Sequence, residues 1–189
     1  MGPAGVFERD KSHVGVYVIC DGWAFRFRRF DDGRRYILNF LIAGDVVSRY
    51  VDFPLRALTD IRFCKYVRTE IIARIMQERR VYDAFMENRV AQRDELAARA
   101  AALAQFSAAG RIAQLILSLR NRLDARGMVH NESFAFPLRQ THIADASGLT
   151  TVHVSRTVGT FRKHEILTIG DGTLTILNLA KLRRIVDGK

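Results

Sequence analysis

The chain has 189 residues, of which 48% are hydrophobic, so it is long enough to bury a core and to form one or two domains. Thirty Lys and Arg residues against twenty Asp and Glu residues give a net charge of +10, which favours a polyanionic partner. Two cysteines are too few for a disulfide scaffold or a zinc finger, and no secretory signal or membrane-spanning apolar segment is found. We therefore expect a soluble, cytoplasmic protein.

The amino-terminal third has the residue pattern of antiparallel strands. The first eleven residues show no periodicity and are expected to be mobile. Asp31-Asp32-Gly33 predicts a hairpin turn, and the stretch around Pro54 is expected to be irregular. The expected strands lie at 14–20, 23–30, 35–42, 44–47 and within 58–67. Four or five such strands would make an incomplete roll.

Two features of these strands have an ordinary structural explanation. Arginines and aromatic residues alternate in the second strand, and we interpret them as the outward and inward faces of a half-exposed strand rather than as a nucleic-acid stacking surface. The alternating residues are Phe25, Arg26, Phe27, Arg28, Arg29 and Phe30. Cys20 and Cys64 each lie in an apolar run, and two buried free thiols are the expected state.

From about residue 69 the apolar residues follow a helical period for more than fifty residues. A short helix is expected around Ile71–Ile75, and a long helix from Val81 to about Gln105. The long helix ends in an alanine-rich segment, and small residues allow a second helix to approach closely, so it is a candidate dimer seam. A single exposed helix and a helix packed within its own chain are the alternatives. An amphipathic helix is expected at 108–123.

The stretch from Arg139 to Leu167 predicts two helices joined by a tight turn. Gly148 separates them, because a steep turn needs a residue at positive φ, and glycine reaches it without steric cost. Thr150 is a good N-cap for the second helix. The apolar residues of that helix, Val154, Val158 and Phe161, would face the first helix, and its exposed side would enter the DNA major groove.

A β-hairpin and a last helix are expected to follow. Gly170-Asp171-Gly172 joins two β-type runs, at 167–169 and 173–176, which would form a wing. Asn178 can cap a helix whose apolar stripe includes Leu182. A helix pair alone is common by chance, but here it comes with a wing and with twelve basic against six acidic residues from Phe106 onward.

Three motifs of the last eighty residues stand out: Gly110-Arg-Ile-Ala-Gln114, the segment from Ile143 to Thr157, and the wing. Together they resemble the Crp/Fnr family of bacterial transcription regulators. Residues 15–23 and 32–45 are similar to the middle of that family's cyclic-nucleotide-binding-like β-roll. The resemblance implies an α+β fold with a partial antiparallel β-roll, a long dimerisation helix and a winged helix-turn-helix. The implied divisions are 1–68 for the roll, 69–106 for the helical linker and dimerisation helix, and 107–189 for the DNA-binding domain.

The resemblance also assigns roles to residues. The family's base-reading positions fall on Thr151, Val152 and Arg156, and Arg156 is the best candidate for a bidentate guanine contact. The phosphate-contacting positions fall on Gln140, Thr150 and His153. The dimerisation residues are expected to be Phe85, Leu96 and Leu103, and the hinge to the DNA-binding domain is expected at Phe106 and Ser107.

Departures from the family's pattern qualify these roles. Val152 stands where many members have an acidic residue, and it cannot accept a hydrogen bond from a cytosine amino group, so the best-known half-site should not be assumed. Ser147 replaces an apolar residue and Arg139 replaces a threonine cap, so the first helix is expected to be less firmly packed.

The roll lacks the features of the known sensors. The phosphate-binding cassette is missing between Val47 and Leu58, and the purine-contacting pair maps to Leu96 and Ala97, which argues against cyclic AMP. Two cysteines cannot hold a four-thiolate cluster, and the histidines suggest no haem or metal site, so no cofactor is expected. The roll also looks short at its amino end, which implies either a start further upstream or a partner that covers its strand edges.

The sequence therefore predicts a DNA-binding transcription regulator that acts as a homodimer on palindromic promoter sites. Its expected partners are double-stranded DNA, a second copy of the chain and, as a further candidate, RNA polymerase. No association with a membrane is expected. The alternative is an effector-independent interaction subunit that pairs with a full-length relative. An enzyme is disfavoured, because no nucleophile, base and orienting group occur together in a motif.

Overall fold

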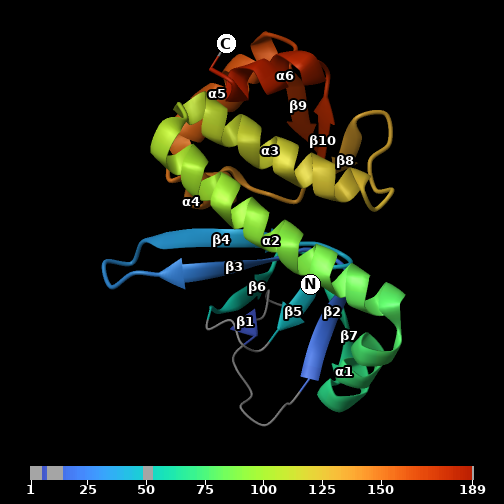
Figure 1. Ribbon diagram of the computed structural model, residues 1–189. Coiled ribbons are helices and arrows are strands. Elements are labelled where there is room, and N and C mark those ends of the chain that lie inside the picture. Colours follow the sequence, from blue (N-terminus) through green and yellow to red (C-terminus); the bar gives the residue numbers. More distant parts are fainter. Residues whose placement is uncertain (1–5, 8–14, 49–52, 189) are drawn as a thin grey trace. The chain divides into compact units, whose positions relative to one another are not determined.

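A computed structural model describes residues 6–7, 15–48 and 53–188 of the chain. The chain divides into two compact units, residues 1–96 and 97–189, and the division falls inside one long helix, α2 (Arg79–Gln105). Helices and antiparallel sheets occur together, which confirms the predicted α+β class (Figure 1). The three-part division predicted from the resemblance remains a prediction.

Among its described residues, the first unit has seven strands in two antiparallel sheets (Figure 1). One sheet has the order β1-β6-β3-β4 and the other the order β5-β2-β7. The strands are β1 (Val6–Phe7), β2 (Gly15–Asp21), β3 (Ala24–Arg29), β4 (Arg35–Leu41), β5 (Val46–Ser48), β6 (Leu55–Ala57) and β7 (Arg62–Val67). The hairpin predicted at Asp31-Asp32-Gly33 joins β3 to β4, with Gly33 at φ 82°.

Two strands lie where none was predicted. β1 lies within the first eleven residues, which were expected to be mobile, and it pairs with β6. β6 begins directly after Pro54 in the stretch expected to be irregular, and it also pairs with β3. Both are held by pairing with distant segments, which local periodicity does not report. The rest of the first eleven residues, and residues 49–52, lie outside the described part of the chain.

Apolar side chains of both sheets form the core of the first unit. Four buried residues form one cluster, and Val47, Ile61 and Phe63 pack against it. The four residues are Ile19, Ala24, Leu41 and Leu55. This burial follows from the alternation of apolar residues along the strands.

The arginine pattern of β3 differs from the prediction. Arg26 was expected to face outward but is only 6% exposed, whereas Phe30 was expected to face inward and is 41% exposed. Burial lowers the pKa of the Arg26 guanidinium, and the nearby Asp45 carboxylate raises it. Arg26 is buried because β3 is covered on both faces over its first four residues, so strand alternation no longer separates inside from outside, and Phe30 lies beyond the end of the strand.

The cysteine prediction was also wrong. Cys20 and Cys64 are joined in a disulfide bond and are not free thiols. They lie on the neighbouring strands β2 and β7, with 6.0 Å between their Cα atoms. Their separation of 44 positions in the sequence gave no indication of this pairing, which depends on the strand register.

The strands of the first unit lead into two helices, both expected from the sequence. α1 (Arg68–Gln77) follows β7 without a loop, and α2 comes directly after it. One face of α2 lies on the roll, since the side-chain amides of Asn88 and Gln92 donate to the carbonyl oxygens of Gly44 and Val46, each over 3.4 Å.

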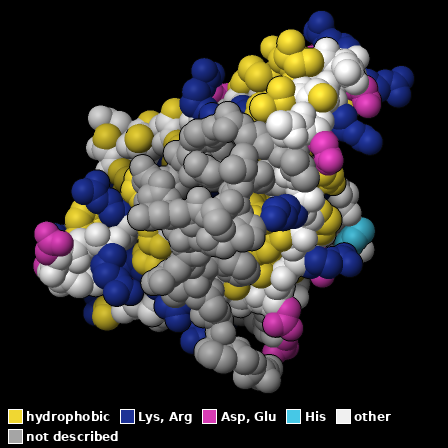
Figure 2. Space-filling model, turned by 90° about the horizontal axis from the view of Figure 1, so that it is seen from below, with side chains coloured by type: hydrophobic (Ala, Val, Ile, Leu, Met, Phe, Trp, Pro, Cys, Tyr) yellow, Lys and Arg dark blue, Asp and Glu magenta, His cyan; other side chains and the backbone are white. Residues whose placement is uncertain are grey.

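Large hydrophobic side chains of these helices reach the surface. Figure 2 shows yellow hydrophobic side chains exposed beside Lys and Arg side chains on one face of the molecule. The exposed hydrophobic residues of α1 and of α2 up to Val90 are Ile72, Met76, Tyr82, Met86 and Val90. These positions lack a covering segment within the described residues of the unit.

The second unit contains a helical core and a three-stranded sheet of order β8-β10-β9 (Figure 1). α3 contributes the largest apolar face, including the buried residues Ile112, Ile116, Leu119 and Leu123, and α6 packs on it. The elements are α3 (Ala108–Asp124), β8 (Ser133–Ala135), α4 (Gln140–Ser147), α5 (Thr151–Lys163), β9 (Leu167–Gly170), β10 (Thr173–Ile176) and α6 (Leu179–Val186). All of these were predicted except β8.

Candidate nucleic-acid interface

The turn between α4 and α5 has the backbone geometry that the sequence predicted. Gly148 lies in the left-handed region, at φ 62° and ψ 39°. The amides of Gly148 and Leu149 both donate to the carbonyl oxygen of Ala144, the latter over 3.1 Å. This pattern ends a helix and turns the chain sharply, which requires a residue without a Cβ cost at positive φ.

A small apolar core holds the two helices together. Ile143 and Ala146 of α4 are buried, as are Val154, Val158 and Phe161 of α5. Leu103 of α2 also approaches the turn, because a Cβ built at Gly148 would lie 3.2 Å from Cδ2 of Leu103. The expectation of a loosely packed first helix is therefore not met on its apolar face.

The weak points of α4 are polar. Arg139 provides no side-chain cap, and its backbone N–H donates instead to Nδ1 of His142 over 3.1 Å. Ser147 is 3% exposed, and its hydroxyl has no hydrogen-bond partner among the described residues. The substitution of Ser for an apolar residue thus leaves a buried polar atom unsatisfied.

Thr150 caps α5 and orients the histidine one turn later. Its Oγ1 accepts from the backbone N–H of His153 over 3.3 Å and lies 3.1 Å from the ring atom Nδ1 of His153. Because Nδ1 is held by the cap, Nε2 is the ring atom that remains for an external partner. The cap predicted from the sequence is confirmed.

The six residues predicted to contact DNA lie on one supersecondary element and are all exposed. Gln140 begins α4, and the other five follow from the cap of α5 onward. The exposed residues are Gln140, Thr150, Thr151, Val152, His153 and Arg156, and Val152 is 56% exposed. Ser155 is exposed beside Arg156 and was not singled out, although its place one turn after Thr151 indicates the same face.

The wing is attached to α5 by an arginine. Nη2 of Arg162 donates to the carbonyl oxygen of Ile169 in β9 over 3.3 Å. At the tip of the wing Asp171 and Gly172 lie at φ 50° and 71°, the geometry of a two-residue hairpin turn. Sequence reasoning missed β8, although Phe134 and Phe136 are both buried on either side of an exposed residue.

An ion pair fixes the turn before β8. Arg120 of α3 donates to both carboxylate oxygens of Glu132, over 3.0 and 2.7 Å, and this hydrogen bonding raises the pKa of Arg120. Glu132 lies at φ 58°, a conformation that costs energy for a residue with a Cβ. The ion pair therefore holds a strained turn against the helix that carries the core.

The residues predicted as a hinge are ordered by hydrogen bonds. Ser107 caps α3, since its Oγ accepts from the amide of Gly110 over 3.1 Å. Nε of Arg111 donates to the carbonyl oxygen of Phe106 over 3.0 Å. The residues around Phe106 and Ser107 are thus tied to the start of α3.

The surface of the helix pair and the wing carries more positive than negative charge. Exposed basic side chains include Arg139, Arg156, Arg162 and Lys163. No cluster of three or more His, Cys, Asp or Glu side chains able to hold a metal ion occurs in the described part of the chain. The same residues include no helix long and apolar enough to cross a membrane.

An exposed helix after a tight turn, a wing and a basic surface together define a winged helix-turn-helix, a DNA-binding architecture. Comparison with known proteins agrees: residues 110–185 match the Crp-like helix-turn-helix domain. The nitrogen fixation regulation protein FixK of Bradyrhizobium diazoefficiens is 25% identical, over 95% of this chain and 77% of that protein. The transcriptional activatory protein AadR of Rhodopseudomonas palustris is 26% identical, over 92% and 74%.

A solved structure shares the fold. FixK2 from Bradyrhizobium japonicum superposes with a TM-score of 0.80 at 21% identity, covering 96% of this chain and 92% of that one. These similarities support a Crp/Fnr-type DNA-binding transcription regulator. The resemblance noted in the sequence is confirmed.

Proposed function

We propose that the protein acts as a homodimer and inserts α5 of each copy into successive major grooves of a palindromic promoter site. The observation that carries this proposal is the exposed face of α5, on which Thr151, Val152 and Arg156 stand free of the core. These three residues would read bases, and Arg156 would pair with guanine. Gln140, Thr150 and His153 would contact phosphates, supported by the amino-terminal ends of α4 and α5.

The surface of α2 supports the homodimer. Met86 and Val90 are 41% and 42% exposed, one turn apart, on the side of the helix opposite to Asn88 and Gln92. The same helical face continues through exposed small residues, Ala97, Ala101 and Ala104. Such a stripe suits close packing against a second copy of the helix.

The three residues expected from the sequence lie elsewhere around α2. Phe85 is half-buried, Leu96 is 46% exposed, and Leu103 lies close to Gly148 of its own chain. We therefore place the centre of the proposed seam at Met86 and Val90, with Leu96 at its margin.

The proposed role needs no catalytic group, and it implies the compartment in which the protein acts. A promoter-binding protein works in the cytoplasm, where bacterial DNA lies, without a membrane partner. RNA polymerase is a proposed further partner, since the relative AadR is named a transcriptional activatory protein.

Selection of random duplex DNA by the purified protein at near-physiological salt tests the proposal. We expect a two-fold symmetric motif whose half-site centres are about 10 base pairs apart. A single, unpaired half-site would contradict the homodimer. Retention of DNA without enrichment of any sequence would contradict specific readout. Recovery of a motif only after a full-length relative is added would favour the alternative subunit role.

A further inference from the structure

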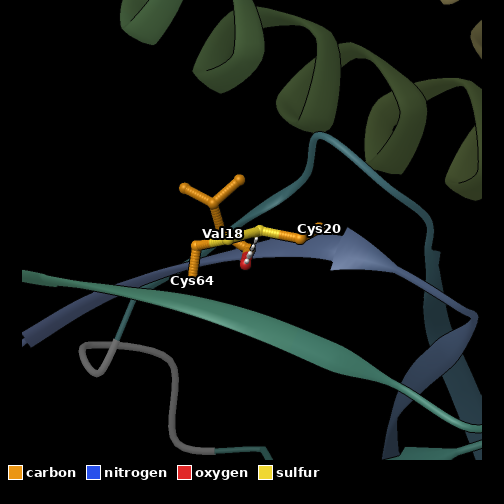
Figure 3. The surroundings of a disulfide bond; sticks show 3 residues. All are labelled: Val18, Cys20 and Cys64. Carbon is orange, nitrogen blue, oxygen red and sulfur yellow. Dashed lines mark hydrogen bonds between the residues drawn. A yellow bond between two sulfur atoms is a disulfide. The ribbon is translucent and has the colours of Figure 1, made fainter.

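The two cysteines meet across the neighbouring strands β2 and β7 (Figure 3), beside a β-bulge in the pairing of these strands. In the pairing of β2 with β7, Val18 lies opposite Cys64, Ile19 opposite Phe63 and Asp21 opposite Arg62, so Cys20 has no partner in the register. A residue inserted in this way redirects a side chain and bends the strand. Here it leaves 6.0 Å between the Cα atoms of Cys20 and Cys64, a separation that a disulfide bond spans.

Both oxidation states have a place in this geometry. Sγ of Cys20 lies 3.8 Å from the carbonyl oxygen of Val18 (Figure 3). A disulfide sulfur carries no proton, so this contact becomes a hydrogen bond only when Cys20 is a free thiol. Reduction therefore exchanges the covalent bond for a hydrogen bond from Cys20 within β2.

The cysteines are accessible enough to react. Both are half-buried and lie outside the buried cluster around Ile19. Ile19 and Phe63, the core residues of the two strands, alternate with Cys20 and Cys64, which places the disulfide on the other face of the sheet. A small thiol or disulfide can reach that face without opening the core.

The bond lies where the sheet continues into the helices. Cys64 is four residues before α1, which starts directly after β7 and contacts both β7 and β2. α1 is followed at once by α2, the helix of the proposed dimer seam. A covalent tie between β2 and β7 therefore restrains the strand from which both helices extend.

We propose that Cys20 and Cys64 form a reversible thiol–disulfide switch that responds to low-molecular-weight disulfides and changes the affinity of the protein for its operator. The proposal rests on the proposed function in one respect: a DNA target places the chain in a reducing compartment. Disulfides are rare in such compartments and are usually transient, and catalytic or redox-sensing.

The oxidation is a pair of thiol–disulfide exchanges. The thiolate of one cysteine attacks a sulfur of oxidised glutathione, forms a mixed disulfide and releases one glutathione thiolate. The thiolate of the second cysteine then attacks the protein sulfur of that mixed disulfide, closes the Cys20–Cys64 bond and releases the second glutathione. Two protein thiols lose their protons and two electrons, and one glutathione disulfide becomes two thiols.

The first test equilibrates the full chain with buffers of graded ratios of reduced to oxidised glutathione, then blocks free thiols by alkylation and measures the intact mass. We expect both thiols to disappear together, with no glutathione adduct, within the range of ratios used. Cys20→Ser and Cys64→Ser should instead retain one glutathione adduct in the oxidised buffers. Two free thiols throughout, an adduct on the wild-type chain, or a disulfide that persists at every ratio would overturn the switch.

The second test measures the affinity of the reduced and the oxidised protein for an operator obtained by selection. We expect the two dissociation constants to differ at least fivefold, and the double variant Cys20→Ala/Cys64→Ala to bind equally in both buffers. Equal affinities of the two wild-type forms would overturn the regulatory role. Loss of specific binding in both forms would reject the proposed function, whereas the thiol titration does not depend on DNA and would still stand.

Discussion

Ser147 and Arg156 lie on opposite sides of the helix-turn-helix, one in its core and one on its surface, and are expected to affect different properties of the protein. Ser147 points into the core, where its hydroxyl has no hydrogen-bond partner among the described residues. Arg156 points outward from α5 and takes no part in the core. The first therefore affects the free energy of unfolding, and the second is expected to affect DNA binding alone.

Replacing Ser147 by Ala should stabilise the protein. A buried hydroxyl without a partner carries a desolvation cost of about 1–3 kcal/mol, and the methyl group removes it. We expect Ser147→Ala to raise the free energy of unfolding by roughly 1 kcal/mol, measured by urea denaturation. Ser155→Ala is the matched control, because Ser155 is an exposed helical serine and reports only helix propensity. Equal effects of the two changes on the free energy of unfolding would show that the buried hydroxyl of Ser147 does not destabilise the protein.

Replacing Arg156 by Ala should weaken specific binding more than general binding. A bidentate contact with guanine contributes about 1–3 kcal/mol of discrimination, so the affinity for the selected operator should fall roughly 5- to 150-fold. Fluorescence anisotropy with operator and scrambled duplexes at one salt concentration measures both. Arg184→Ala removes the same charge from exposed α6 and should affect the two duplexes alike. If Arg156→Ala weakens both duplexes equally, it is not a base-reading residue.

Two connections between elements of the second unit depend on single features: a glycine in the turn between α4 and α5, and a side-chain ion pair before β8. Gly148 allows α4 and α5 to meet, and the paired Arg120 and Glu132 hold the turn before β8. Neither feature belongs to the apolar periodicity that forms the helices themselves. Changes at these positions should therefore alter stability without altering helix content.

Two Gly→Ala substitutions in the helix-turn-helix should have opposite effects. At Gly148 a Cβ meets the left-handed conformation and Leu103 at 3.2 Å, so Gly148→Ala should destabilise the protein by about 1–2 kcal/mol. At Gly159, within α5, nothing lies within 4 Å of a new Cβ, so Gly159→Ala should stabilise it by about 0.5–1 kcal/mol. Thermal unfolding followed by circular dichroism measures both. The same sign for the two variants would contradict the assigned turn geometry.

Breaking the pair of Arg120 and Glu132 should destabilise the second unit. The Arg120 side chain is 14% exposed and makes two charge-assisted hydrogen bonds with Glu132 and a third with Asp124, each of the kind that contributes about 1.5–3 kcal/mol. We expect Arg120→Met to lower the free energy of unfolding by roughly 2 kcal/mol in urea. A double-mutant cycle with Glu132→Gln isolates the pair, and additive losses would show that the two side chains are not coupled.

At the scale of the whole molecule, the proposed homodimer depends on one uncovered helical face. Met86 and Val90 carry its largest apolar side chains, and a charge at the centre of such a seam would be buried beside its counterpart in the second copy. The oligomeric state therefore links α2 to DNA binding.

Val90→Glu should disrupt self-association. We expect a dissociation constant of the dimer at least tenfold higher, measured by sedimentation velocity over a concentration series, with weaker operator binding as a consequence. Ala84→Glu adds the same charge to an exposed position about a third of a turn around the helix, and it should leave the dimer intact. An unchanged dimer in Val90→Glu would place the interface elsewhere.

The sequence by itself determined the elements that depend on local patterns. Apolar period, capping residues and turn glycines predicted the helices, the wing and the β3–β4 hairpin, and Thr150 and Asn178 cap their helices as expected. The exposed face of α5 follows directly from that period. Each of these features depends on residues that are close to one another in the sequence, so the sequence alone is enough to predict it.

Only the tertiary structure decided which distant segments meet. It paired Cys20 with Cys64, added β1 and β8 to their sheets, buried Arg26 and brought Leu103 against Gly148. Each of these depends on strand register or on packing between segments far apart in the chain, and a shift of one residue would reverse which side chains face inward. The local pattern carries no record of that register.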